Sequence, residues 1–423
     1  MICLVRRAMF DEYVRAQSPG SYPSAVRQFP GNPRKDLHQV LTASTEAEKE
    51  EIYRLRYQVY IEEMRGHIRH TEADRIRRQL RDQWDDTAYH FYIRESGTML
   101  ACARLNLRRH GPVECEAQFE IGKFRPFFPD NVCMTSRLVL HRNIRGSHLL
   151  KLLTCAMYRF GREQDMRLNF IDCHPQWLPL YSRLGYRVYR PGFNHQKYTY
   201  VIPMVLVGDD LDYLEQVKSP FLPIARRYRA SMKGRQLLFS RFPHAAHVHP
   251  GTPIEDGSLR FLLSDRLSDD TGPIERFDLL RGMTLDEAKA LFTLGHVVSC
   301  RAGDTVLNPG DPGREIFLIL TGSFQVQKRT GGQDKVLKIL ASGETFGETR
   351  FLREELRQAS VKARENATFL VLNARALDRL VMSAPKIAAK LFRNMARIVA
   401  MRQCDSVRFV RFPKPRAKRG RDA

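Results

Sequence analysis

Short apolar runs separated by glycine-containing turns fill the C-terminal third of this chain. Residues 317–326 read as a buried-strand pattern broken by the turn glycine Gly322. Upstream, residues 301–304 and 308–313 combine Gly, Pro, Asp and Asn, which tight turns favour. Several short strands at this spacing predict a small β-roll or barrel. An apolar helical stretch at 374–401 follows it.

A glycine, a carboxylate and an arginine lie in the segment 343–363, next to this pattern. Gly347 and Glu348 are adjacent, and Arg357 comes ten positions after the glycine. A glycine lets backbone amides close on a phosphate, and amides at the start of a short helix favour an anion. A carboxylate can accept a hydrogen bond from a ribose hydroxyl, and an arginine fork fits a phosphate better than lysine does. The spacing therefore suits the parts of a cyclic nucleotide.

Residues 277–404 resemble the cyclic-nucleotide-binding domain family. The matching stretches are FDLLRGMTLDEAKALF, RAGDTVLNPGDPGREIFLILTGSFQV and FGETRFLREELRQASVKA. The resemblance implies that Glu348 meets the ribose and Arg357 the cyclic phosphate. The nucleotide-binding set that it implies is Gly347, Glu348, Thr349, Arg357, Gln358 and Ser360.

Two positions near this loop bear on the ligand. Gln358 stands where guanine-selective relatives commonly have threonine, so cyclic AMP is favoured over cyclic GMP. At 349–351 the family usually has small or aliphatic residues, and Arg350 either adds charge beside the phosphate or obstructs the pocket. The alternative interpretation is a roll that binds no ligand and serves only for packing.

The N-terminal half alternates helix and strand patterns. A capping box at Thr45–Glu48 predicts a helix that places Ile52, Leu55 and Val59 on one buried face. Strands are expected at 89–94, 100–107, 132–140, 168–173 and 197–207, and further helices at 146–163 and 177–184. This order predicts a mixed α/β sheet. The whole chain is therefore expected to be an α+β multidomain protein.

The stretch LYSRLGY at 180–186 resembles the late helix-turn of GNAT-type N-acyltransferases. The resemblance implies that Tyr181 is a general acid that protonates the departing thiolate. A half-buried packing role is the alternative for this tyrosine.

A second resemblance, over residues 52–207, is to acyl-homoserine-lactone synthases and the related N-acyl amino acid synthases, which use acyl carrier protein. It is carried by Arg56, Tyr60, Asp82, Asp85, Arg104 and Arg137. Such charges on different elements can orient an amine substrate through its carboxylate, or they can order an N-terminal lid. Met134 stands where homoserine-lactone synthases have a candidate base, and Glu120 is the candidate that replaces it, directly or through water.

The acyl donor is predicted from the run 142–150. There His148 and Leu150 stand where coenzyme A-dependent GNAT enzymes have the small residues of a phosphate loop, although Gly146 is present. This disfavours coenzyme A and favours acyl carrier protein. Carrier proteins are acidic, and this chain has a formal net charge of +22. The same charge also suits peripheral contact with an anionic membrane surface.

Composition completes the domain plan. A loose lead-in is expected at 1–36, an acyltransferase domain at 37–207, a linker with a basic helical segment at 208–276, the nucleotide-binding domain at 277–404 and a basic disordered tail at 405–423. Eight scattered cysteines without a C-x-x-C pair indicate a reduced, cytoplasmic protein with neither a disulfide framework nor a zinc site. The histidines His244, His247 and His249 indicate a surface loop, so no metal is expected.

Together these patterns predict an N-acyltransferase that moves an acyl group from acyl carrier protein to a small amine or amino acid, under cyclic-nucleotide control. Main-chain amides of the strand at 132–140 would stabilise the oxyanion. The alternative is a catalytically inactive, cyclic-nucleotide-responsive sensor or adaptor, which Met134 favours. A catabolite-activator-like regulator ranks third. It needs a helix-turn-helix after the sensor, and the nineteen residues after Cys404 contain Pro413 and Pro415, so no nucleic acid partner is expected.

Overall fold

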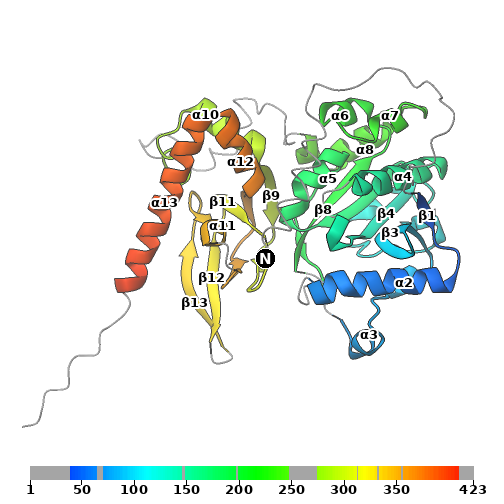
Figure 1. Ribbon diagram of the computed structural model, residues 1–423. Helices are drawn as coiled ribbons and strands as arrows, with labels where there is room; N and C mark the ends of the chain where they lie inside the picture. The colour runs from blue at the N-terminus through cyan, green and yellow to red at the C-terminus, as the bar shows by residue number, and fades with distance from the viewer. Residues whose placement is uncertain are drawn as a thin grey trace, which may run out of the picture.

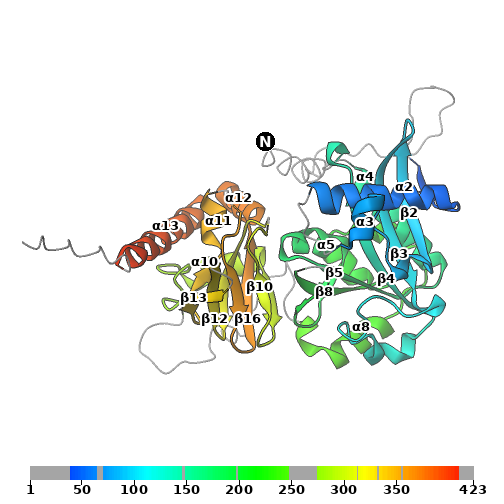
Figure 2. The ribbon, with the colours of Figure 1, turned by 90° about the horizontal axis from the view of Figure 1, so that it is seen from below.

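The structure is a computed structural model, and it describes residues 39–63, 70–144, 148–196, 199–246, 274–311, 313–330, 333–353 and 356–408. The predicted lead-in at 1–36, Gly146, the side chains of the histidine run at 244–249 and most of the predicted basic tail lie outside the described residues. The chain forms an N-terminal domain and a roll domain that lie side by side (Figures 1 and 2).

One mixed sheet is the centre of the N-terminal domain, as the sequence predicts. Its strands are β1 Val40–Thr42, β2 Ala88–Glu95, β3 Thr98–Leu107, β4 Val132–Leu140, β5 Leu168–Cys173, β6 Arg187–Val188, β7 Phe193–Asn194 and β8 Tyr200–Val207. The order is β1-β2-β3-β4-β5-β8-β6, with β7 also paired to β8. All the pairs are antiparallel except β4 with β5.

Helices cover both faces of this sheet (Figure 1). They are α2 Glu46–Tyr57, α3 Glu72–Arg77, α4 Leu149–Glu163 and α5 Leu178–Leu184; α2 continues into a π-helical turn at Gln58–Glu63, and short 3-10 turns lie at Gln83–Asp85, Arg108–His110, Ile121–Phe127, Arg142–Ile144 and Pro175–Trp177. Successive strand residues point to opposite faces. Phe91 accordingly packs in the cluster that contains α4, whereas its neighbour Tyr92 packs with Ile52 and Leu55 of α2. The predicted capping box of α2 forms between Thr45 and Glu48.

The segment after β8 packs onto the N-terminal domain. It forms α6 Leu211–Gln216, α7 Leu222–Ala225, α8 Lys233–Arg241 and a 3-10 turn at Pro243–Ala246. Phe221 stacks on Tyr158 of α4 with ring centroids 4.6 Å apart, and Phe242 stacks on Phe124 at 5.7 Å. The helices of the predicted linker therefore extend the core of the sheet domain and carry their basic residues on its surface.

The roll domain consists of two four-stranded sheets with flanking helices, as predicted. One sheet has the order β10 Thr305–Leu307, β15 Ser360–Ala363, β12 Phe324–Thr330, β13 Gln333–Leu340; the other has β14 Thr345–Phe346, β11 Glu315–Thr321, β16 Ala367–Asn373, β9 His296–Cys300. The helices are α10 Leu285–Leu294, α11 Glu348–Arg353, α12 Ala374–Ser383 and α13 Pro385–Arg408. Four phenylalanines fill the space between the sheets: Phe317, Phe324, Phe346 and Phe369.

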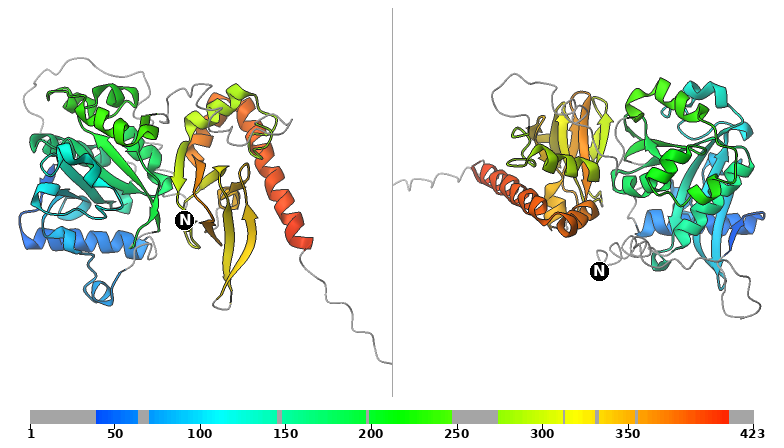
Figure 3. Two further views of the ribbon diagram at one scale, coloured as in Figure 1. Left: turned by 180° about the vertical axis from the view of Figure 1, so that it is seen from behind. Right: turned by 90° about the horizontal axis from the view of Figure 1, so that it is seen from above.

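One boundary differs from the expectation of a single helical stretch at 374–401. The stretch divides into α12 and α13 at Ala384, whose backbone has φ −146° and ψ 68°. Pro385 is the reason, because the residue before a proline is driven away from the α conformation. The division turns α13 along the side of the roll that faces away from the N-terminal domain (Figure 3).

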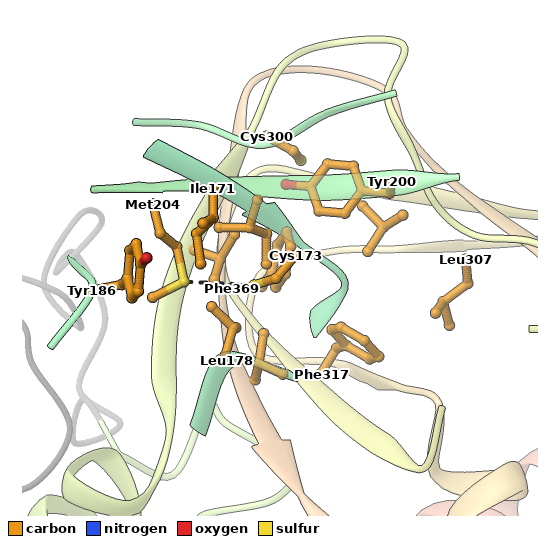
Figure 4. Close-up of a cluster of buried hydrophobic side chains, with 14 of the residues drawn as sticks. Ile171, Cys173, Leu178, Tyr186, Tyr200, Met204, Cys300, Leu307, Phe317 and Phe369 are labelled. Carbon is orange, nitrogen blue, oxygen red and sulfur yellow. Dashed lines mark hydrogen bonds between the residues drawn. The ribbon is translucent and has the colours of Figure 1, made fainter. Parts of the chain in front are cut away.

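The two domains meet where β8 begins. The Tyr200 hydroxyl donates to the carbonyl oxygen of Ser299 on β9 at 3.1 Å, and the amide of Gly192 donates to the same oxygen at 2.9 Å. Figure 4 shows Tyr200 among the roll residues Cys300, Leu307, Phe317 and Phe369. Apolar packing is thus continuous from one domain into the other.

Candidate functional site

A buried charge network occupies one end of the N-terminal sheet. Arg104 is fully buried; its Nη1 lies 2.5 Å from Asp82 and 3.1 Å from Asp85, and its Nη2 lies 2.7 Å from Glu114. Arg56 pairs with Asp85 at 2.7 Å, and Arg137 pairs with Asp82. The structure therefore brings together five of the six residues of the synthase-like set and adds Glu114, which the sequence reasoning missed.

Charge balance explains how this network tolerates burial. Arg56, Arg104 and Arg137 face Asp82, Asp85 and Glu114. Burial alone would raise the pKa of Asp85, but Arg56 and Arg104 lower it to about 2. His90 completes the contacts of Arg56 at 3.1 Å, and burial together with Arg56 lowers its pKa to about 4. The His90 imidazole is therefore neutral at pH 7 and the Asp85 carboxylate is ionised.

Strands β4 and β5 separate beside this network. They pair only from Val132 to Met134 with Leu168 to Phe170, so β4 runs on past Met134 without β5. Arg137, in the separated part, has a φ of 55°, and the register with β3 shifts between Cys102 and Arg104. Such a bulge re-aims backbone groups. We call this unpaired stretch, next to the buried charges, the gap between β4 and β5.

Two tyrosines and a carboxylate approach this gap from different elements. Tyr60 lies on the π-helical turn, Tyr181 on α5 and Asp172 on β5, and all three are half-buried. Tyr60 interacts electrostatically with Arg137 and Asp172, and Tyr181 interacts with Tyr60 and Asp172. Burial raises the pKa of Tyr60 to about 12 and that of Tyr181 well above its usual value. Both phenols therefore keep their protons at pH 7.

Asp172 is the strongest proton acceptor in this group. Burial, reinforced by Glu114 and opposed by Arg137, raises its pKa to about 6. A carboxylate in this range is ionised at pH 7 and still basic enough to take a proton. An acid inside the apolar strand sequence LNFIDC was the signal that could have identified it. Met134, by contrast, is buried in an apolar cluster with Val132 and Phe170.

Glu120 lies in a different setting. Its carboxylate contacts Lys123 at 2.5 Å, Arg190 at 2.9 Å and Arg301 at 3.6 Å. Burial would raise its pKa, but these cations lower it, which weakens it as a base. Glu120 also lines an open hollow of about 730 Å³ together with Trp84 and Val113. The geometry therefore favours Asp172 over Glu120 as the proton acceptor.

If the expected acyl transfer uses Asp172 as its general base, replacing Asp172 with asparagine should slow the reaction at pH 7 by about a hundredfold or more. The wild-type rate should rise with pH through about 6, and the variant's rate should lose this dependence. Stability should change in the opposite direction. The folded-state pKa lies above the ordinary 3.8, so ionisation of Asp172 destabilises the fold above pH 6 but not below pH 4.

The measurement is a pH–rate profile with thermal unfolding at pH 4 and pH 7.5. The variant should be more stable by about 1–3 kcal/mol at pH 7.5 only. Asp165→Asn, on an exposed turn before the same strand, is the control. An unchanged pH–rate profile in Asp172→Asn would remove Asp172 from the chemistry.

In the roll domain, Arg357 is anchored where the sequence places the phosphate. Its Nη1 donates to the carbonyl oxygen of Gly347 at 2.7 Å, and its Nη2 donates to that of Glu315 at 2.8 Å. Gly347 has a φ of 89°, and an added Cβ would lie 2.7 Å from the Glu315 oxygen and 2.9 Å from Arg357 Nη1. Only glycine fits this position, so the loop holds its backbone against the arginine.

Glu348 is buried beside Arg357 with unused hydrogen-bonding capacity. One carboxylate oxygen contacts Arg402 of α13 at 2.6 Å and accepts from Thr349 at 3.1 Å. Among the described residues, the other oxygen has no partner, and neither has the hydroxyl of buried Thr345 nearby. Buried acceptors without partners are rare, and a bound ribose hydroxyl would satisfy this one. The surroundings of Glu348 thus fit the ribose of a cyclic nucleotide, which the sequence predicts at this position.

The remaining residues of the predicted nucleotide set lie around this centre. Gln358 is exposed, and Ser360 is half-buried at the start of β15. Arg350 is buried and interacts electrostatically with Arg357, so two cations share this region. Arg402, which reaches the site from α13, is a contact that sequence spacing could not reveal.

Known family models match both domains. The model of the N-acyl amino acid synthase FeeM family matches residues 51–208, and the cyclic nucleotide-binding domain model matches residues 297–384. The predicted fusion is confirmed. The N-terminal match supports acyltransferase activity, and the C-terminal match supports a cyclic nucleotide ligand.

Curated relatives match shorter stretches. Glutaminase 1 of Bradyrhizobium diazoefficiens is 29% identical over 29% of this chain and 20% of its own length. The cyclic AMP receptor protein of Thermus thermophilus is 32% identical over 22% of this chain and 44% of its own, and human cGMP-dependent protein kinase 2 is 29% identical over 21% and 12%. The chain therefore spans less than half the length of each of these relatives.

Among solved structures, the catabolite activator protein of Thermus thermophilus is 26% identical, with a TM-score of 0.29 over 31% of this chain and 60% of that one. In the part of the chain that the structure describes, no helix is both long and apolar enough to cross a membrane. The same residues contain no group of three or more His, Cys, Asp or Glu side chains placed to hold a metal.

Proposed function

We propose that this protein is an N-acyltransferase that moves an acyl group from acyl carrier protein to a small amine or amino acid, under the control of a cyclic nucleotide. The gap between β4 and β5 carries the proposal, because Tyr60, Tyr181 and Asp172 converge on it beside Arg137. A separated strand pair gives an extended thioester arm a place to lie against the sheet. The charge network holds the surrounding residues in position.

In this proposal the amine nitrogen attacks the thioester carbonyl. The carbon–nitrogen bond forms, Asp172 takes the proton that the amine loses, and main-chain amides of β4 stabilise the oxyanion. The carbon–sulfur bond then breaks, and Tyr181 gives its proton to the leaving thiolate. A substrate carboxylate would be oriented by Arg137, which faces the same gap.

Acyl carrier protein is preferred to coenzyme A as the donor for two reasons. His148 occupies the N-cap of α4 without a capping hydrogen bond and Leu150 is buried in the core, so side chains stand where small residues would admit a pyrophosphate. The net charge of +22 complements an acidic carrier protein. Cyclic AMP is preferred over cyclic GMP because of Gln358. The cytoplasmic setting and the anionic membrane contact stay predictions from composition.

The test is direct. Purified protein is mixed with acyl carrier protein thioesters or acyl-coenzyme A and a pool of amines and amino acids, and N-acyl products are sought by mass spectrometry with and without cyclic nucleotides. Product from the carrier thioester, with a rate that changes on adding nucleotide, is the expected result. If no donor yields product under any condition, the inactive sensor becomes the better description of this chain.

Tyr181→Phe should lower kcat by about a hundredfold while leaving KM for the amine nearly unchanged, because a phenyl ring packs like a phenol but has no proton to donate. Donors with a more acidic leaving thiol should recover most of the loss. Tyr89→Phe is the matched control, since Tyr89 packs on Phe160 at 4.7 Å away from this group. Equal kcat values in the two variants would assign Tyr181 to packing.

A further inference from the structure

A pocket lies between the two domains and contains the phosphate-site arginine. Its walls include Leu307, Glu315 and Arg357 from the roll and His174, Thr199 and Tyr200 from the N-terminal domain. Leu307 ends β10, and Tyr200 begins β8. The loop that contains Glu348 and Arg357 therefore has two neighbours. Glu348 contacts Arg402 of α13, and Arg357 lines a pocket with residues of the N-terminal domain.

Hydrogen bonds hold the side of the pocket that the N-terminal domain forms, which we call the wall (His174–Gln176, Thr199 and Tyr200). The ring nitrogen Nδ1 of His174 lies 3.2 Å from the carbonyl oxygen of Tyr200 and 3.5 Å from the hydroxyl of Thr199. Tyr200 is in turn fixed to Ser299 of the roll at 3.1 Å. Polar groups of one domain thus line the same pocket as the guanidinium of the other. An anion that pairs with the guanidinium would meet hydrogen-bonding groups on its other side.

The free volume of this pocket is small. It amounts to about 30 Å³, which admits a water molecule but not a nucleotide. A cyclic nucleotide whose phosphate approaches Arg357 from this side must therefore press on the 174–176 and 199–200 segments. Such a ligand would contact the N-terminal domain as well as the roll.

This wall is directly connected to the acyl-transfer gap. His174 follows β5 immediately, and Asp172 lies on β5 two residues earlier. Trp177 ends the short turn Pro175–Trp177 and leads into α5, which carries Tyr181. A shift of the wall is therefore transmitted over a few covalently linked residues to both groups assigned to proton transfer.

We propose that the cyclic-nucleotide site is a joint site of the two domains, in which Thr199 and His174 contact the ligand opposite Arg357. The inference rests on the proposed nucleotide binding and adds to it a specific set of ligand contacts. Coupling between sites is reciprocal. An acyl donor that changes the position of β5 should change nucleotide affinity by the same factor by which the nucleotide changes donor affinity.

Tryptophan fluorescence gives the first test, because the chain has two tryptophans and Trp177 borders the wall. In Trp84→Phe protein, cyclic AMP or cyclic GMP should change the Trp177 emission in a saturable way, with the midpoint that calorimetry gives for binding. Calorimetric binding without any emission change would overturn the joint site and leave the nucleotide proposal standing. Absence of heat with both nucleotides in wild-type protein would overturn both.

Affinity measurements give a second test that does not depend on the tryptophan variant. Thr199→Val keeps the side-chain volume and removes the hydroxyl, so it should weaken nucleotide binding about three- to tenfold, as should His174→Ala. Thr293→Val is the control, because Thr293 lies on α10 and its hydroxyl contacts only the Lys289 carbonyl among the bonds described. Unchanged or tighter binding in Thr199→Val and His174→Ala would show that the wall does not hold the ligand, and the proposal would fail.

Discussion

Arg104→Met is expected to lower the free energy of unfolding by about 3–5 kcal/mol and to abolish acyl transfer. The guanidinium is fully buried and contacts Asp82, Asp85 and Glu114. Methionine fills a similar volume, so the loss comes mainly from three carboxylates left in a poorly solvated site with one cation fewer. Removing one partner of a buried network destabilises more than the network itself contributes.

Urea unfolding and the product assay measure the two effects. Arg54→Met is the matched control. Arg54 lies on the exposed face of α2 and pairs with Glu50 at 3.3 Å with about half of each side chain in solvent, so its loss should change stability by less than about 1 kcal/mol. If Arg104→Met lowers the free energy of unfolding no more than the control does, the buried acids must be protonated or hydrated when the guanidinium is absent. The network would then have no structural role.

Arg357→Lys should weaken cyclic-nucleotide binding by about 1.5–3 kcal/mol, or roughly 10- to 150-fold in Kd. The arginine uses two arms to hold the carbonyl oxygens of Gly347 and Glu315, and its planar fork also suits a phosphate. Lysine keeps the charge, but its single ammonium cannot replace both arms. The lysine variant is more informative than alanine because the buried site retains a cation.

Calorimetry with cyclic AMP and cyclic GMP measures the change, with Arg364→Lys, at an exposed position after β15, as the control. Affinities that match wild type within twofold would contradict the assignment of Arg357 to the phosphate. Arg357→Lys tests whether the roll binds a nucleotide through this arginine. Thr199→Val tests whether the N-terminal domain also contacts that nucleotide, so the two variants test the two proposals separately.

The local pattern was enough to predict most elements. Strands β4 and β5 begin and end at the residues expected from their apolar runs, and the turn at Ser96 and Gly97 joins β2 to β3 with both residues at positive φ. These features depend on the alternation of side chains along a strand and on the residues that turns prefer, and both can be read from residues adjacent in the sequence. The packing of α6 to α8 could not be predicted in this way, because it depends on distant partners such as Tyr158 and Phe124.

The candidate sites divide along the same line. The resemblance to the synthases identified Arg56, Tyr60, Asp82, Asp85, Arg104 and Arg137 as a set. The candidate base was placed at Glu120, because Asp172 is hidden in a strand. Only the fold shows that Lys123 and Arg190 neutralise the first carboxylate while burial raises the pKa of the second. Proton affinity is set by neighbours in space, which the order of residues does not give.

By itself, the sequence determined that this chain joins an acyltransferase-like sheet to a cyclic-nucleotide-binding roll, because its local motifs resemble those of two known families. The tertiary structure alone decided how they are combined. It inserts Tyr200 of β8 among the roll's apolar residues and places His174 and Thr199 across from Arg357. The reason is physical: a motif fixes the chemistry of its own loop, whereas the apolar faces that remain exposed on each domain determine which surfaces bury one another.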